Sequence, residues 1–159
     1  MAKMLIGYYS RTKHTQHMAE KVAEGARKVQ GLTVELKALS QVQARDLLGY
    51  DAILLGSPTY YGSMAAEMKK LFDDSVAFHG KLEGKVGGAF SSSANVGGGN
   101  ETTILDILKA MLIHGMVVRG TSAGDHYGPV AIGDVDERSG QQCKDLGQRM
   151  GELAVKLHG

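Results

Sequence analysis

The chain has 159 residues, which suits one domain with a substantial core, so we expect a single domain over residues 1–159. Charged residues make up 22% and hydrophobic residues 43%, and 18 basic residues against 17 acidic ones leave a net charge of +1. A chain without a broad basic field gives no support to binding of nucleic acid or of an anionic membrane. It has no apolar stretch of membrane-spanning length and no signal-peptide pattern, so we expect a cytoplasmic protein. Because Cys143 is the single cysteine, we expect no internal disulfide.

Five short apolar runs predict the strands of a sheet. They cover residues 4–9, 32–39, 52–55, 86–90 and 116–118. The second run alternates more than the others, which is typical of an edge strand. The others are apolar apart from one glycine in the first run and two in the fourth. Runs of this kind are what parallel strands covered by helices on both faces require.

Four segments between or after these runs carry apolar residues at spacings of three and four, which predicts amphipathic helices. The four stripes are Met18, Val22, Ala26 and Val29; Met64, Met68, Leu71 and Phe72; Ile104, Ile107, Leu108 and Met111; and Leu146, Met150, Leu153 and Leu157. Residues 40–49 leave room for one or two helical turns, and residues 121–135 predict a loop or a broken strand. The alternation predicts a doubly wound α/β domain, with a five-stranded parallel sheet in the order 2-1-3-4-5 and helices on both faces.

In such a sheet, a ligand binds beyond the carboxyl ends of the strands, where the winding direction reverses. The loop after the first strand comprises Ser10, Arg11, Thr12, Lys13, His14 and Thr15. Its hydroxyls, together with the N–H groups at the start of a helix, suit one phosphate group. The alternative is a plain helix cap by Thr12, although three hydroxyls exceed what capping needs. Neither a Walker A loop nor a Gly-x-Gly-x-x-Gly fingerprint is present.

Two further loops follow the third and fourth predicted strands. The first of them contains Pro58, Thr59, Tyr60, Tyr61 and Gly62. Its paired tyrosines predict stacking on a flat ring. The alternative is a turn whose tyrosines pack on neighbouring surface. The other contains Ser92, Ser93, Ala94, Asn95, Val96, Gly97 and Gly98. Its backbone N–H groups suit hydrogen bonding to the polar edge of a heterocycle. The alternative is a flexible linker. A phosphate loop, an aromatic clamp and an amide cradle together predict a pocket for flavin mononucleotide (FMN).

These segments resemble a known family. Residues 8–15, Tyr-Tyr-Ser-Arg-Thr-Lys-His-Thr, resemble the flavodoxin phosphate loop. Residues 56–64 are similar to the Gly-Thr-Pro-Thr-Arg-Phe-Gly-Asn-Met of the WrbA-type quinone oxidoreductases, and residues 90–104 and His114-Gly115-Met116 resemble further motifs of that family. The resemblance implies a flavodoxin-like fold and FMN bound without a covalent link. Residues 10–15 would then hold the phosphate, residues 58–62 border the isoalloxazine, and residues 92–98 cover the ribityl and pyrimidine side.

The chain also departs from the WrbA pattern. It is shorter, because it lacks an insertion after the second strand, it contains no tryptophan, and Ile113 stands where that family has a second histidine. These differences leave quinone reduction and homo-oligomer formation open. The net charge of +1 likewise departs from the strongly acidic classical flavodoxins.

Several functions remain open on the sequence. The first is an FMN electron carrier that serves a redox partner protein, and the second is an FMN-dependent reductase that takes NAD(P)H and a quinone. The third is a flavin-free regulatory module; a signalling receiver domain is disfavoured, because Tyr9-Ser10 and Gly56-Ser57 replace the acidic residues it needs. His126 lies in a loop that we expect at the flavin end, where it either touches phosphate, flavin or substrate or is an ordinary loop histidine. We name no catalytic residue, because FMN performs the redox chemistry, and no metal site, because His14 and His17 lack a third ligand.

Overall fold

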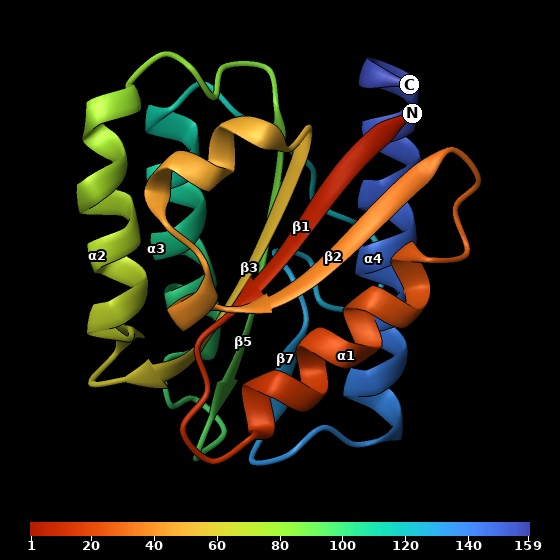
Figure 1. The fold of residues 1–159 in the computed structure, drawn as a ribbon. Helices are drawn as coiled ribbons and strands as arrows, with labels where there is room; N and C mark the ends of the chain where they lie inside the picture. Colours follow the sequence, from red (N-terminus) through yellow and green to blue (C-terminus); the bar gives the residue numbers. More distant parts are fainter.

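A twisted parallel sheet forms the centre of the structure, a computed structural model that describes residues 1–159 (Figure 1). Its strands are β1 (Ala2–Tyr8), β2 (Leu32–Ala38), β3 (Ala52–Tyr60), β5 (Val86–Ser93), β6 (Val117–Val118) and β7 (Val130–Ile132), with the order β2-β1-β3-β5-β6. The strand β7 also pairs in parallel with β5. The order predicted from the sequence is confirmed, and its fifth position is divided between β6 and β7.

The divided fifth position has a simple geometric basis. Val117 pairs with Val86 at the start of β5, whereas Val130 pairs with Ser91 near its end. Residues 119–129 leave the sheet between these two pairings and return to it. The broken strand expected within residues 121–135 is therefore β7.

Four helices cover the sheet in two layers, with α1 (His14–Ala26) and α4 (Glu137–His158) on one face and α2 (Ala66–Ser75) and α3 (Asn100–Ile113) on the other (Figure 1). Each corresponds to one of the predicted apolar stripes. The connection from β2 to β3 contains only the short 3-10 helices η1 (Leu39–Gln41) and η2 (Ala44–Gly49), as its length predicts. A further 3-10 helix, η3 (Val76–Phe78), follows α2.

The core has one half on each face of the sheet, because successive side chains of a strand point to opposite faces. In β1, Met4 and Ile6 pack in the half that α1 and α4 cover. Leu5 of the same strand packs in the other half, together with Ile53 and Leu55 of β3. All five side chains are almost completely buried, which explains why these strands lack the polar alternation of an edge strand.

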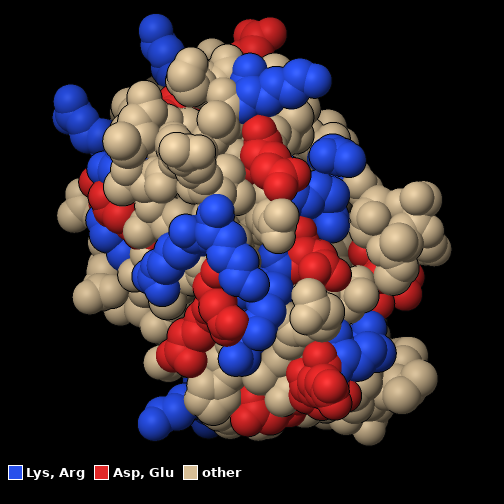
Figure 2. Space-filling model, turned by 90° about the vertical axis from the view of Figure 1, so that its right-hand side faces the viewer, with Lys and Arg blue, Asp and Glu red and all other residues tan.

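Charges on the surface alternate in sign. Figure 2 shows Lys and Arg interspersed with Asp and Glu on the side of the molecule that carries α1 and α4. On this side Glu24 pairs with Lys21 and with Lys144. No helix combines the length and the apolar character that crossing a membrane requires. Cys143 is buried in α4, and burial raises the pKa of its thiol to about 12, so the thiol is unreactive.

His114 is a buried histidine between the carboxyl ends of α2 and α3. It is 6% exposed, its Nε2 lies 2.7 Å from Ser75 Oγ, and its Nδ1 has no hydrogen-bond partner. Burial, and secondly the charge of His79, lowers the pKa of His114 in the folded chain. The unfolded chain therefore takes up this proton first. The stability that neutral, buried His114 contributes is complete above the ordinary histidine pKa of about 6.5. It is lost as the pH falls from that value toward the lower pKa of His114 in the folded chain.

We expect acidification to lower the melting temperature partly through His114. In wild-type protein the melting temperature should fall between about pH 7.5 and about pH 5.5, and His114→Gln should show a smaller fall, because glutamine does not titrate. Calorimetry across this range measures the effect. His158→Gln, at an exposed histidine, should follow the wild type. Equal pH slopes for wild type and His114→Gln would contradict the assignment.

Candidate functional site

The first predicted loop leads from β1 into α1 without a side-chain cap. Lys13 occupies the N-cap position with φ of 71°, a left-handed conformation, and no side chain caps the helix. The backbone N–H groups of residues 11–16 have no hydrogen-bond partner in the chain. By contrast, Asp136 caps α4 by accepting a hydrogen bond from Ser139 N. Thr12 therefore does not act as a cap, and the amino end of α1 is left available to an anion.

Two hydroxyl groups of this loop are buried, and one of them has a hydrogen-bond partner. Ser10 Oγ is inaccessible to solvent and has no hydrogen-bond partner. Thr15 is 1% exposed, and its Oγ1 lies 3.1 Å from Ser92 Oγ, so it joins the first loop to the end of β5. A buried hydroxyl without a partner is costly, and a phosphate oxygen would satisfy it. The phosphate of FMN fits this donor set, which is uncharged except for Arg11 and Lys13 at the rim.

The second predicted loop is a β-hairpin. The strand β3 continues through Pro58 and Thr59 to Tyr60, and it pairs antiparallel with β4 (Ser63–Met64). Tyr61 and Gly62 form the two-residue turn, with φ of 52° and 82°. Positive φ at both central residues is the signature of a type I′ turn, which matches the twist of the strands.

Tyr61 stands fully exposed at the tip of this hairpin. Its exposed fraction is 111%, so its ring contributes no packing to the fold. The neighbouring Tyr60 instead packs edge-on against Tyr9, with ring centroids 6.2 Å apart. The alternative in which both tyrosines pack on neighbouring surface is therefore wrong for Tyr61. A bulky residue in a left-handed conformation with an unused ring is a candidate for ligand stacking.

We expect Tyr61→Asn to stabilise the ligand-free chain while weakening FMN binding. Asparagine tolerates the left-handed conformation, which costs other residues about 1–2 kcal/mol, so the melting temperature should rise. Loss of an aromatic contact of about 0.5–1.5 kcal/mol should raise the Kd for FMN roughly 2- to 10-fold. Thermal melts and fluorescence titration measure the two effects. Tyr127→Asn, at an exposed tyrosine without positive φ, serves as the control, and a Kd unchanged by Tyr61→Asn would exclude stacking by Tyr61.

The third predicted loop is shorter than expected, because β5 extends through Ser91, Ser92 and Ser93. The hydroxyl of Ser93 donates to Asn95 O at 2.9 Å and accepts from Asn100 Nδ2 at 2.9 Å. The side chains of Ser92 and Ser93 are thus engaged within the protein. Residues 94–98 remain exposed and offer backbone groups, as the cradle requires.

The three segments meet at one end of the sheet. Thr15 contacts Ser92, and Tyr9, beside the first loop, contacts Tyr60. A Cβ added to Gly99, next to the third loop, would lie 3.3 Å from Gly62 Cα in the hairpin turn. Three segments that are distant in the sequence therefore lie together at one end of the sheet, as the rule for doubly wound sheets predicts. The flexible-linker alternative for the third segment does not fit this arrangement.

His126 lies apart from these three segments. It lines a small cavity with Gly87 and Gly88 at the start of β5, and its Nδ1 lies 2.9 Å from Thr121 O. Gly87 is six residues from Ser93, which corresponds to roughly 20 Å along a strand. The expected position of His126 at the flavin end is therefore wrong. Residues 119–129 return along the edge of β5 instead of projecting beyond the sheet.

One residue of the site escapes prediction from the sequence. Tyr9 follows β1 directly, and in the sequence it is the last residue of an apolar run. Burial raises the pKa of its phenol, and the nearby Glu67 and Tyr60 add to this effect. A second aromatic residue immediately after the strand is the signal that marks it, since β1 ends at Tyr8.

Comparison with known proteins agrees with this geometry. The family model described as NADPH-dependent FMN reductase matches residues 3–128. A protein named flavodoxin from Aquifex aeolicus is 39% identical over 168 residues, covering 100% of this chain and 91% of that protein. An NAD(P)H dehydrogenase (quinone) from Rhodopseudomonas palustris is 36% identical over 200 residues, covering all of both chains.

A solved structure gives the same result for the fold. The flavodoxin, WrbA-like protein from Agrobacterium tumefaciens superposes with a TM-score of 0.83 at 28% identity, covering 99% of each chain. The fold and the resemblance expected from the three loops are confirmed. The chain belongs to the NADPH-dependent FMN reductase family and has the flavodoxin-like fold.

Proposed function

We propose that the chain binds one FMN without a covalent link, between the three segments, and carries electrons to and from a redox partner protein. The observation that carries the proposal is the amino end of α1, where the N–H groups of residues 11–16 and Ser10 Oγ all lack partners. A site with donors only, next to two exposed cations, is suited to a phosphate dianion.

Each segment has a distinct role in this proposal. Residues 10–15 anchor the phosphate and thereby fix the position of the cofactor. Residues 58–62 border the ring, with Tyr61 stacking on it, and residues 92–98 supply backbone hydrogen bonds to its polar edge. FMN supplies the redox chemistry when it is bound, and the protein determines access to it.

The exposure of the second and third segments favours a carrier. Tyr61 at the hairpin tip is 111% exposed and Val96 in the third segment is 87% exposed. Apolar groups at the rim of an open site suit transient contact with another protein. The ring edge between them would be accessible to a docked partner.

The experiment begins with the purified chain and added FMN. Saturable quenching of FMN fluorescence, with one FMN bound for each chain, supports the proposal. A colourless protein that does not take up added FMN would contradict it and would favour the flavin-free module.

The second candidate is an NAD(P)H-dependent quinone reductase. The family match and the relatives named NAD(P)H dehydrogenase (quinone) favour it. Stopped-flow mixing of the FMN-loaded protein with NADPH separates the two. Fast bleaching of the flavin, followed by reoxidation on addition of a quinone, supports the reductase, and an inert flavin supports the carrier.

A further inference from the structure

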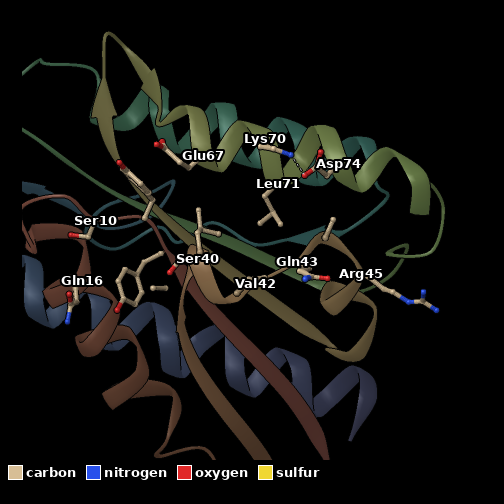
Figure 3. Close-up of a pocket in the computed structure, with 15 residues that line it drawn as sticks. Ser10, Gln16, Ser40, Val42, Gln43, Arg45, Glu67, Lys70, Leu71 and Asp74 are labelled. Atoms are coloured by element: carbon tan, nitrogen blue, oxygen red, sulfur yellow. Dashed lines mark hydrogen bonds and ion pairs between the residues drawn. The ribbon is translucent and has the colours of Figure 1, made fainter.

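A hollow lies beside the candidate flavin site. It has a volume of about 700 Å³ and is bounded by the end of β1, residues 38–45 after β2, and α2 (Figure 3). We name it the crossover cavity. It exists because η1 and η2 are too short to cover this part of the sheet as a full crossover helix would. Cavities of about 300–1,000 Å³ are typical of small-molecule sites.

The crossover cavity is distinct from the space that the proposed flavin site occupies between the three segments. Ser10 is the single residue that it shares with the sequence-predicted FMN positions. Tyr9 lines it and separates it from the hairpin, because its ring packs against Tyr60 at a centroid distance of 6.2 Å. Ser10 and Gln16, which belong to the proposed phosphate site, line one end of the crossover cavity, so a bound FMN would leave the space between α2 and residues 38–45 to another ligand.

The walls of the cavity are apolar on two opposing sides. Figure 3 shows Leu71 of α2 and Val42 of the crossover on opposite walls. Leu71 is 6% exposed and Val42 is 9% exposed, so both are firmly packed. Leu39 and Ala44 extend the apolar surface on the crossover side. A space between two apolar walls suits a flat ring system.

The formal charges of the side chains that line the cavity sum to zero. Lys70 pairs with Asp74 at 2.6 Å on the α2 side, and Glu67 and Arg45 add one charge of each sign (Figure 3). Balanced charges give a charged ligand no net attraction to offset its desolvation. The side chains of Ser40 and Gln43 line the cavity without hydrogen-bond partners in the chain, so they are available to a ligand hydroxyl or carbonyl.

We propose that the crossover cavity is a second small-molecule site, which binds an uncharged, planar aromatic compound carrying a hydroxyl or carbonyl group. The probe is 2-naphthol, which is neutral at pH 7. Its matched charged forms are 2-naphthoate and 2-naphthylmethylammonium. Binding is followed by two-dimensional NMR of the ¹⁵N-labelled chain, both without FMN and after loading with FMN.

We expect saturable shifts in the amide signals of residues 38–45 and 67–74 on addition of 2-naphthol. Both charged probes should bind at least about tenfold more weakly. Ala44→Trp, which fills the cavity from a partly exposed position, should weaken 2-naphthol binding at least about tenfold. Ala110→Trp, at a partly exposed alanine of α3, should bind as the wild type does.

A further variant tests the charge balance without risk to the core. Lys70→Gln, at an exposed position, leaves Glu67 and Asp74 against Arg45 alone. It should therefore strengthen binding of the cationic probe relative to 2-naphthol. An unchanged preference would overturn the charge argument.

Three results would overturn the proposal: no saturable binding of 2-naphthol, shifts confined to residues that do not line the cavity, or equal binding by wild type and a folded Ala44→Trp. These measurements do not depend on the proposed function. If the chain fails to bind FMN, the electron-carrier proposal is wrong, while the measurements without FMN still decide the second site.

Discussion

Replacement of Ser10 by alanine is expected to weaken FMN binding without destabilising the ligand-free protein. Ser10 Oγ is buried and has no partner in the chain, so its removal takes away an unsatisfied group. Such a group costs about 1–3 kcal/mol, and the melting temperature of the ligand-free variant should stay the same or rise. Because a hydrogen bond to a charged group contributes about 1.5–3 kcal/mol, the Kd for FMN should rise roughly 10- to 100-fold.

Fluorescence titration and thermal melts of the same preparations measure both quantities. Ser122→Ala is the matched control, because Ser122 is exposed and makes no hydrogen bond in the chain. It should leave both the Kd and the melting temperature unchanged. If Ser10→Ala lowered stability and left the Kd unchanged, Ser10 would be a structural residue and the phosphate would bind elsewhere.

The scaffold that presents Ser10 is readily predicted from sequence, for a physical reason. The central strands are buried on both faces, so they appear as unbroken apolar runs such as residues 52–55. The helices bury one face each, so they appear as stripes at spacings of three and four. The order of the sheet then brings the loops after β1, β3 and β5 to the same end.

The local geometry of the site is less predictable. The turn at Tyr61 and Gly62 requires positive φ at both residues, a conformation that Asn-Gly signals and Tyr-Gly does not. Ser91 to Ser93 continue β5 although serine is not a strong strand former, because Ser91 and Ser92 pair with Ser57 and Pro58 of β3. In both places tertiary pairing overrides local preference.

The position of His126 and the crossover cavity depend on contacts between distant segments. Residues 119–129 fold back along β5, and nothing in their composition specifies that direction. The cavity lies where η1 and η2 leave the sheet uncovered. A sequence pattern indicates which side chains are present, and it does not indicate which part of a sheet they leave uncovered. Such features emerge from the packed structure alone.

The packing of α1 against α4 provides the other large expected effect. Gly25 and Gly147 allow the two helix backbones to approach closely. A Cβ on Gly147 would overlap the carbonyl oxygen of Val22, and one on Gly25 would overlap that of Lys144. Because the obstacles are backbone atoms, a larger side chain would have to move a whole helix.

Gly147→Ala is therefore expected to destabilise the protein, although alanine favours a helix over glycine by about 1 kcal/mol. Overpacking typically costs about 1–3 kcal/mol and occasionally more, and a clash with backbone belongs at the upper end. We expect a net loss of about 1–2 kcal/mol, which lowers the melting temperature by roughly 2–8 °C in a domain of this size. Chemical denaturation provides the free energy of unfolding.

Gly140→Ala, in the same helix, is the matched control with the opposite sign. A Cβ there would meet its nearest atom, Val135 Cγ2, at 3.6 Å, an ordinary contact. The variant should gain up to about 1 kcal/mol of stability from helix propensity alone. The difference between the two alanines isolates the close approach of the helices, because propensity contributes equally to both. If Gly147→Ala stabilised the protein as much as Gly140→Ala, the backbones of α1 and α4 would not be in contact.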